Sequence, residues 1–239
     1  MGIKGFKVDF MDRDDQTAIE MVERLAACTA KHHLILDLHG IYKPHGLNRT
    51  YPNILNSESD VTFPYIRMMA GQVDFTPGAM RNGTRDNWKA IYTKPISMGT
   101  RCHQAACYIV QDSPFTMLAD TPTNYEADEP YTRYIASLPV VFDKTIVPQG
   151  EIGKYIVTVR KKGNDWYVGG QSNWDERTLT LKFDFLADGD YEAIVLKDGI
   201  NANHDAEDYK IEKSVINQKS EMKIHLASGG GFVIKVIKK

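Results

Sequence analysis

The spacing of apolar and polar positions divides the chain into two parts. Up to about Val141, apolar runs alternate with stretches of helical period. Residues 5–10 have a strand-like pattern, and residues 33–40 form a near-continuous apolar run of the kind found in parallel sheets that are covered on both faces. The stretch between them predicts a helix capped by Asp14 or Asp15, because its apolar residues recur at helical spacing. The residues on its apolar face are Ile19, Val22, Leu25 and Ala26.

The alternation of strands and helices continues through the rest of this first part. It predicts a short helix at 63–71, a strand with a turn at 72–78, a helix at 100–112, a strand at 115–120 and a last helix at 124–139. This order indicates an α/β sheet or a (β/α) barrel. A closed barrel has eight strand–helix units, and only three or four are visible here. We therefore expect either an open sheet or the C-terminal piece of a longer protein.

From about Glu151 onward the apolar pattern has a period of two. Turn signals such as Gly-Asn-Asp and Asp-Gly-Asp separate about seven short strands, which predicts an antiparallel β-sandwich. Residues 140–153 are expected to be a linker, and the glycine-rich residues 228–232 a hairpin turn. The predicted fold class is therefore α/β plus β, with a first domain at 1–143 and a β-sandwich domain at 144–239.

Composition and charge exclude several classes of protein. The 239 residues are 42% hydrophobic and 25% charged, which is ordinary for a packed globular chain and argues against wholesale disorder. The net charge is −2 and the basic residues are scattered, so neither nucleic acid nor a membrane surface is an expected partner. No apolar run approaches the roughly 18 residues of a membrane span, and no signal-peptide pattern is seen.

The three cysteines do not predict a disulfide framework. Cys28, Cys102 and Cys107 are an odd and sparse set on apparent helices, and we expect them to be buried as small apolar residues. No Cys-x-x-Cys pair or His/Cys cluster supports zinc.

Polar residues end three of the predicted strands. Asp9 lies inside its apolar run, Asp37 and His39 close the second strand, and Asp120 closes a later one. In parallel α/β folds these ends face one mouth, where a carboxylate can serve as nucleophile, general base or metal ligand.

The alternative is that such aspartates cap helices or form turns, and we favour it for Asp12, Asp14 and Asp15. Lys7 shares the strand face of Asp9, and its charge favours an ionised carboxylate there; the alternative is a simple ion pair.

The loop after the second strand is polar and contains aromatic residues. Tyr42, Arg49, Tyr51 and Asn53 offer hydrogen bonds and ring faces, a mixture that carbohydrate sites use. The alternative is a surface loop with turn residues. His39 and His103 are further acid/base candidates, although the sequence identifies no partner for either.

Five blocks of sequence together resemble glycoside hydrolase family 97, closest to its retaining α-galactosidase branch. The blocks are GFKVDFMDRDDQ, LILDLHGIYKPHGLNRTYPNIL, AGQVDFTPGAMRN, GTRCHQAACYIVQDSPFTMLADTPTNY and GEIGKYIVTVRKKGNDWYVGG. The resemblance implies an N-terminal β-sandwich, then a (β/α)8 barrel, then a C-terminal β domain. This chain would then begin near the fourth barrel strand, so that residues 1–143 are the C-terminal part of the barrel.

The same resemblance implies roles for individual residues. Asp9 matches the nucleophile of the retaining branch, whereas Gly40 stands where the inverting branch has its glutamate base. Lys7 matches a lysine that contacts the sugar, and His39 and Arg49 are assigned to substrate binding with it. Glu58 matches a calcium ligand, so a calcium ion is the expected cofactor. The stretch that carries the acid/base glutamate has no counterpart between Glu58 and Asp60.

These observations support three functional hypotheses. The first is a fragment of a retaining α-galactosidase-like enzyme that acts by double displacement through Asp9 on an α-galactoside or related oligosaccharide. The second is a catalytically silent carbohydrate-binding remnant that lacks the acid/base glutamate. The third is a metal-dependent phosphohydrolase built on the aspartate cluster. The resemblance also implies a periplasmic or secreted protein, and exposed strand faces of a partial barrel predict self-association.

Overall fold

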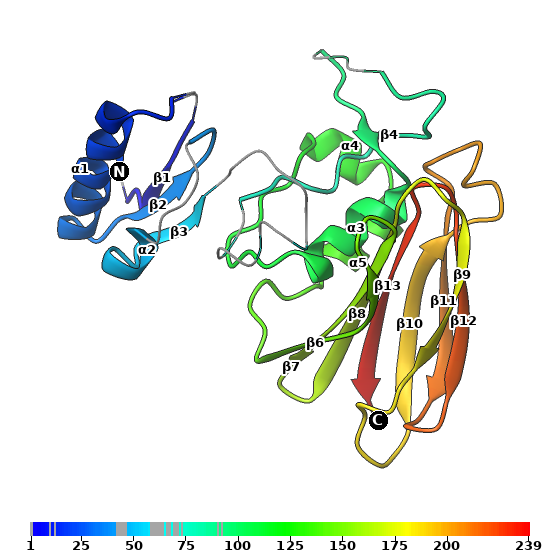
Figure 1. Ribbon diagram of the computed structural model, residues 1–239. Helices are drawn as coiled ribbons and strands as arrows, with labels where there is room; N and C mark the ends of the chain where they lie inside the picture. The colour runs from blue at the N-terminus through cyan, green and yellow to red at the C-terminus, as the bar shows by residue number, and fades with distance from the viewer. Residues whose placement is uncertain are drawn as a thin grey trace. The chain divides into compact units, whose positions relative to one another are not determined.

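The computed structural model describes residues 2–9, 11, 13–41, 47–57, 65, 68, 72, 74–89, 91 and 93–239, without the side chains of residues 48 and 55–57. The chain forms two compact units, which are described separately (Figure 1). The first unit contains residues 1–76 and 111–117, and the second contains 77–110 and 118–239. None of the helices in the described ranges has the length and apolar character needed to cross a bilayer.

The first unit is built on a three-stranded parallel sheet. Its strands lie in the order β1-β2-β3, and Figure 1 shows α1 running alongside them. The parallel pairing predicted for the first two apolar runs is therefore confirmed. The elements are β1 (Gly5–Val8), α1 (Gln16–Lys31), β2 (Ile35–Leu38), α2 (Leu47–Thr50) and β3 (Ile54–Ser57).

Local sequence explains both ends of α1. Asp15 is the N-cap, and its side chain accepts a hydrogen bond of 2.9 Å from the backbone N–H of Ala18, as predicted. At the other end, His33 has a φ of 54° and donates its N–H to the carbonyl of Ala30, while Leu34 donates to Thr29. This pair of bonds is a Schellman motif, which turns the chain directly from α1 into β2.

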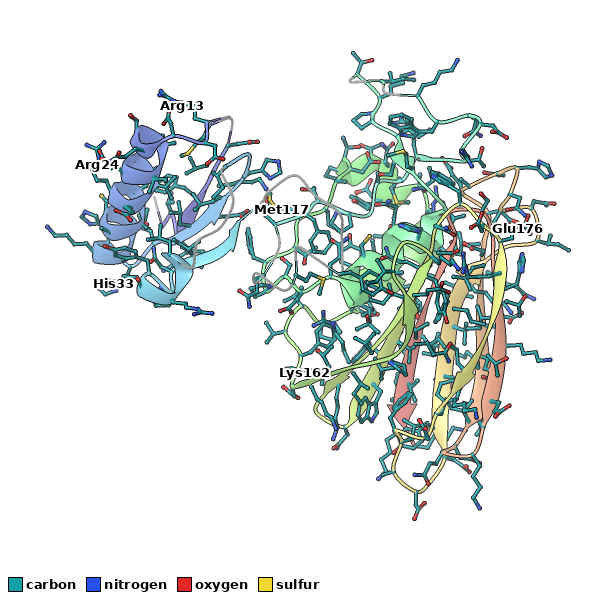
Figure 2. The ribbon with its side chains drawn as sticks, in the orientation of Figure 1. Arg13, Arg24, His33, Met117, Lys162 and Glu176 are labelled. Atoms are coloured by element: carbon teal, nitrogen blue, oxygen red, sulfur yellow. The ribbon has the colours of Figure 1, made fainter. Side chains whose placement is uncertain are left out.

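One face of the parallel sheet packs on α1. Leu36, Leu38 and Ile54 from the sheet form a buried cluster with Ala18, Val22 and Ala26 from the helix. Ile19 and Leu25 pack against this cluster, so the apolar helix face read from the sequence is confirmed. Figure 2 labels Arg24, whose side chain lies on the outer side of α1. Because α1 covers only one face, the other face of the sheet can carry polar side chains.

The second unit contains the sandwich. Its larger sheet is antiparallel, with six strands in the order β11-β10-β13-β8-β7-β6, and a separate pair β12-β9 faces it. Buried residues from both layers, including Val168, Leu181, Ile224 and Phe232, form its core. The strands are β6 (Lys144–Glu151), β7 (Tyr155–Lys162), β8 (Asp165–Ser172), β9 (Arg177–Lys182), β10 (Tyr191–Asp198), β11 (Tyr209–Ile216), β12 (Glu221–Leu226) and β13 (Gly231–Lys238).

The predicted sandwich is confirmed, with two corrections. Residues 144–151 are not a linker but the edge strand β6, whose apolar residues are too few to mark it in the sequence. The glycine-rich segment 228–232 is not a hairpin turn, because β12 pairs with β9 while β13 lies in the larger sheet. Lys162, labelled in Figure 2, ends β7 at its antiparallel turn into β8.

Three helices pack with the second unit. They are α3 (Arg101–Val110), α4 (Pro122–Glu126) and α5 (Glu129–Ala136), and α3 lies against β8 and β13 (Figure 1). The single helix predicted at 124–139 is therefore two short helices, because Asp128 caps a new helix by accepting from the N–H of Tyr131. A short parallel pair, β4 (Asn82–Gly83) and β5 (Ser97–Met98), completes this unit.

Other expectations for the first part need correction or lie outside the described residues. Residues 115–120 do not form a strand, and none is found at 72 or 74–78. The helix expected at 63–71 lies almost wholly outside the described residues. The barrel implied by the family resemblance is not shown by the three-stranded sheet, and the domain boundary at 143 stays a prediction. Cys102 and Cys107 are buried as expected, but Cys28 is exposed.

Candidate active site

The face of the parallel sheet opposite α1 carries polar side chains. Lys7 and Asp37 are direct partners in the register of β1 and β2. Side chains two positions apart share a strand face, so Asp9 lies on the side of Lys7, and His39 on the side of Asp37. The alternate positions Leu36 and Leu38 point to α1. Strand alternation therefore separates an apolar face from a polar one.

Lys7 lies between two buried carboxylates. Its Nζ donates to Asp74 Oδ2 at 2.7 Å and lies 3.5 Å from Asp37 Oδ2. The side chains of Asp37 and Asp74 are 2% and 0% exposed, so both contacts are shielded from solvent. Burial by itself lowers the pKa of Lys7, but the two carboxylates outweigh it and raise that pKa above its usual value.

Asp37 holds its charge less readily than an exposed aspartate. Burial is the main cause and the neighbouring Asp74 the next, and together they raise the pKa of Asp37 to about 6 although Lys7 opposes the shift. Neither carboxylate oxygen of Asp37 has a hydrogen-bond partner among the described residues. The Lys7 ammonium, with its Nζ 3.5 Å from Asp37 Oδ2, is the main group that favours the ionised form, and His39 favours it as well.

His39 links this cluster to Asp9. Its Nδ1 is hydrogen-bonded to Asp74 Oδ2, the same oxygen that accepts from Lys7. An ionised carboxylate only accepts hydrogen bonds, so Nδ1 carries a proton in this contact. The other ring nitrogen, Nε2, lies 3.9 Å from Asp9 Oδ2. The Asp9 side chain is 32% exposed, so a ligand can reach its carboxylate, whereas the side chains of Asp37 and Asp74 are buried.

The structure brings together three of the five predicted site residues. Lys7, Asp9 and His39 lie in one cluster on the polar sheet face. Arg49 lies on α2, where it is exposed, and no contact among the described residues joins it to this cluster. Glu58 lies outside the described residues. The chemical role of each of these five residues stays a prediction.

Asp74 is the member of the cluster that sequence reasoning missed. It lies 67 positions after Lys7 and in no regular element, so neither spacing nor period points to it. One signal was present: the tripeptide Val-Asp-Phe occurs at residues 8–10 and again at 73–75. Asp120, in contrast, accepts from the N–H of the adjacent Thr121 and from the N–H of Met80, which lies 40 positions away, so only the first contact is of the local kind considered as its alternative.

The carboxylates of this cluster are not arranged as a metal site. Calcium takes six to eight oxygen ligands, and no group of three His, Cys, Asp or Glu side chains among the described residues could hold an ion. The Lys7 ammonium already provides the positive charge between Asp37 and Asp74. The calcium site therefore stays a prediction resting on Glu58. The metal-dependent phosphohydrolase hypothesis gains no support from the described geometry.

A mostly apolar hollow of about 470 Å³ borders the outer edge of β1. Lys7 and Asp9 line one side of it, and residues of α1 such as Leu25 and Cys28 line the other. Its walls carry few polar groups apart from Lys7 and Asp9, so we assign the polar chemistry to the sheet face and not to this edge.

Two family profiles match the chain. The profile described as glycoside hydrolase 97 matches residues 1–60, and the one described as glycosyl-hydrolase 97 C-terminal, oligomerisation, matches residues 141–237. Together they match well over half of the chain. The first match includes Lys7, Asp9, Asp37 and His39 of the polar cluster but not Asp74, and the second covers most of the sandwich.

Two related proteins are described as a retaining alpha-galactosidase and a probable one. A retaining alpha-galactosidase of Bacteroides thetaiotaomicron is 48% identical over 255 aligned positions, which include 99% of this chain and 38% of that protein. A probable retaining alpha-galactosidase of Streptomyces bingchenggensis is 29% identical over 71% of this chain and 27% of its own length. The chain thus spans well under half the length of these relatives.

Solved structures agree with the sequence comparison. A glycoside hydrolase family 97 enzyme from Pseudoalteromonas sp. strain K8, in complex with panose, superposes with a TM-score of 0.83 at 30% identity, over 95% of this chain and 38% of that one. A beta-arabinopyranosidase superposes with a TM-score of 0.80 at 21% identity, which shows a shared fold only. On the matching profiles, relatives and folds, the chain belongs to glycoside hydrolase family 97, as the five sequence blocks indicated.

Proposed function

We propose that this chain contributes the nucleophile and part of the sugar-binding surface to a retaining α-galactosidase. The observation that carries the proposal is the position of Asp9 directly after β1, where its side chain is 32% exposed and its Oδ2 lies 3.9 Å from His39 Nε2. The 48% identity to a retaining alpha-galactosidase supports the same reaction and substrate class.

The proposed reaction has two displacements. In the first, an Asp9 oxygen attacks the anomeric carbon, the bond from that carbon to the leaving oxygen breaks, and a β-galactosyl ester forms. In the second, water attacks the same carbon, the bond to Asp9 breaks, and α-galactose is released. Two inversions give net retention. Lys7 is proposed to donate a hydrogen bond to a sugar hydroxyl through its ammonium group. His39 is proposed to accept one from a sugar hydroxyl at Nε2, because its Nδ1 is engaged by Asp74.

Gly40 supports retention over inversion. The inverting branch of the family places its glutamate base at the position of Gly40. Here that residue has a φ of 57°, a left-handed conformation that glycine adopts at little cost and a glutamate would not.

The acid/base residue of the proposed mechanism is not assigned to this chain. A retaining enzyme needs a second carboxyl group about 5–5.5 Å from the nucleophile. Asp37 and Asp74 are buried and engaged with Lys7, which leaves them poorly placed to reach a leaving group on the far side of a sugar. The alignment with the Bacteroides relative has 255 positions, more than the 239 residues here, so that relative has residues with no counterpart in this chain. We propose that such a segment supplies the acid.

The substrate class follows from the relatives. The named activity of the two sequence relatives is on α-galactosides, and the Pseudoalteromonas structures hold the oligosaccharides panose and acarbose. We therefore propose an α-galactoside or a related oligosaccharide as the ligand. Self-association stays a prediction.

The nucleophile assignment is tested with an activated aryl α-galactoside and the full-length protein. A good leaving group needs little acid assistance, so we expect turnover to depend mainly on Asp9. Asp9→Ala should lower kcat at least about 10³-fold. Added azide should restore turnover in this variant and yield a β-galactosyl azide, because the small anion takes the place of the missing carboxylate.

The exposed neighbour Asp14 provides a matched control. Asp14→Asn should leave kcat unchanged, and a mechanism-based fluoro-galactoside should label Asp9 in the wild-type protein. Wild-type rates in Asp9→Ala, or a label on another residue, would rule out this nucleophile. Galactose binding without any turnover would instead support the silent carbohydrate-binding remnant.

A further inference from the structure

Asp74 contacts both side chains to which sugar binding is assigned. Its Oδ2 accepts from Lys7 Nζ at 2.7 Å and is hydrogen-bonded to His39 Nδ1. We propose that Asp74 is a positioning residue, which holds Lys7 and His39 in the orientation that serves Asp9. This inference rests on the proposed function and adds to it a residue from outside the β1 and β2 strands.

Complete burial restricts the motion of the Asp74 side chain. Its side chain is 0% exposed, and the adjacent Phe75 is also buried, so the carboxylate has little freedom to move. The side chains of Lys7 and His39, in contrast, are each 25% exposed. A long lysine side chain and a histidine ring lose rotational freedom when they share one buried acceptor.

For His39, the contact with Asp74 selects one tautomer. With the proton on Nδ1, a neutral ring has its lone pair on Nε2, the atom that lies 3.9 Å from Asp9 Oδ2. A carboxylate bonded to one ring nitrogen also fixes the ring plane, and this is the usual way in which proteins orient a functional histidine. The direction in which Nε2 points is therefore set by Asp74.

For Lys7, Asp74 is the closer of two carboxylates. The contact with Asp74 is a hydrogen bond of 2.7 Å, whereas Asp37 is 3.5 Å away and accepts no hydrogen bond from the described residues. Asp37 therefore provides Lys7 with an opposite charge only, whereas Asp74 provides an opposite charge and a hydrogen bond that orients the ammonium group. Asp37 is thus the matched comparison, because it is equally buried and beside the same lysine but makes no hydrogen bond to His39.

Double-mutant cycles test whether Asp74 acts through these two residues. In the full-length protein, Asp74→Asn keeps the side-chain volume and should lower kcat/KM for an activated aryl α-galactoside by about 10- to 100-fold, the size seen for residues that orient functional groups. In a Lys7→Ala/His39→Ala background, the same substitution should lower kcat/KM by less than about 3-fold. Asp37→Asn should cause the smaller loss of the two single variants.

A buried aspartate in the second unit provides the control for stability. Asp198 is also buried and accepts hydrogen bonds, and Asp198→Asn should change the Tm without changing kcat/KM per folded molecule. The positioning role is overturned if Asp74→Asn has the kcat/KM of the wild type. It is also overturned if the substitution lowers kcat/KM by the same factor in the wild-type and the Lys7→Ala/His39→Ala backgrounds. If the wild type itself shows neither turnover nor labelling of Asp9, the proposed function has failed instead.

Discussion

The charged residues of the candidate site differ in how far apart they lie in the sequence. Lys7, Asp9, Asp37 and His39 come from two neighbouring strands and the positions directly after them. Period-two alternation puts the first two on one face and the last two on one face, and the register of β1 and β2 brings the pairs together. The residue that joins them, Asp74, comes from a distant segment with no regular structure. A short-range pattern therefore identifies which side chains share a surface, while the shared acceptor needs the folded chain.

His33 offers a test of local backbone preference in the first unit. Its φ of 54° is a left-handed conformation that glycine favours at this position of a Schellman motif. His33→Gly should stabilise the end of α1 by about 0.5–1 kcal/mol. Amide exchange of buried α1 residues such as Val22 and Ala26 should slow by about 2- to 5-fold in this variant, provided that they exchange by opening of this unit.

The neighbouring His32 is the control for this prediction. It is the C-cap residue, with a φ of −97°, so glycine gains nothing there and adds entropy to the unfolded chain. His32→Gly should speed the same amide exchange. An equal effect of the two substitutions would contradict the conformational argument.

At the scale of whole elements, the main packing contact that no sequence pattern predicts is the close approach of α3 to β8. A Cβ atom on Gly169 would lie 2.6 Å from Ile109 Cβ, so this glycine lets the helix lie directly on the strand. Arg160 of β7 donates to the carbonyls of Ile109 and Val110 at the C-terminal end of α3, where positive charge is favourable. The helix is thus fixed to the sheet by shape and by charge.

Adding one methyl group should disturb this contact. Gly169→Ala should lower the stability of the second unit by about 1–3 kcal/mol, because helix and strand backbones must move apart. All three tryptophans, Trp88, Trp166 and Trp174, belong to this unit, so fluorescence during urea unfolding reports it selectively. A variant with unchanged midpoint and slope would show that the helix does not depend on this approach.

At the scale of the whole molecule, two kinds of ionisable group, one buried and one in an ion pair at the surface, make stability depend on pH in opposite directions. Burial raises the pKa of Asp198 to about 6, against the hydrogen bonds it accepts from Thr100, Ala227 and Gly231. The folded state therefore binds this proton in a pH range where the unfolded chain has lost it. The resulting stability is present near pH 4 and is lost as pH rises through 6. Lys197 and Lys210 lower the pKa of Glu212 to about 2. The contribution of Glu212 to stability is therefore present above the pKa of the unfolded chain and is lost as pH falls.

A comparison of variants isolates the contribution of Asp198. Relative to Asp198→Asn, the wild-type protein should lose on the order of 2 kcal/mol of unfolding free energy between pH 4 and pH 7. Urea unfolding followed by tryptophan fluorescence at several pH values measures this difference. A difference that does not vary with pH would show that Asp198 ionises in the folded state as it does in the unfolded chain.

Residue patterns alone were enough to identify the βαβ start, an aspartate cap of α1 at position 14 or 15, the antiparallel sandwich and the shared face of Lys7 and Asp9, because each depends on residues close together in the chain. They were insufficient for β6, which is an edge strand with few apolar residues, and for the break between α4 and α5 at a new cap. The packing of α3 on the sandwich and the contact of Asp74 with Lys7 and His39 depended on tertiary structure. The physical reason is that burial, and the hydrogen bonds it makes necessary, join segments whose local sequences carry no information about each other.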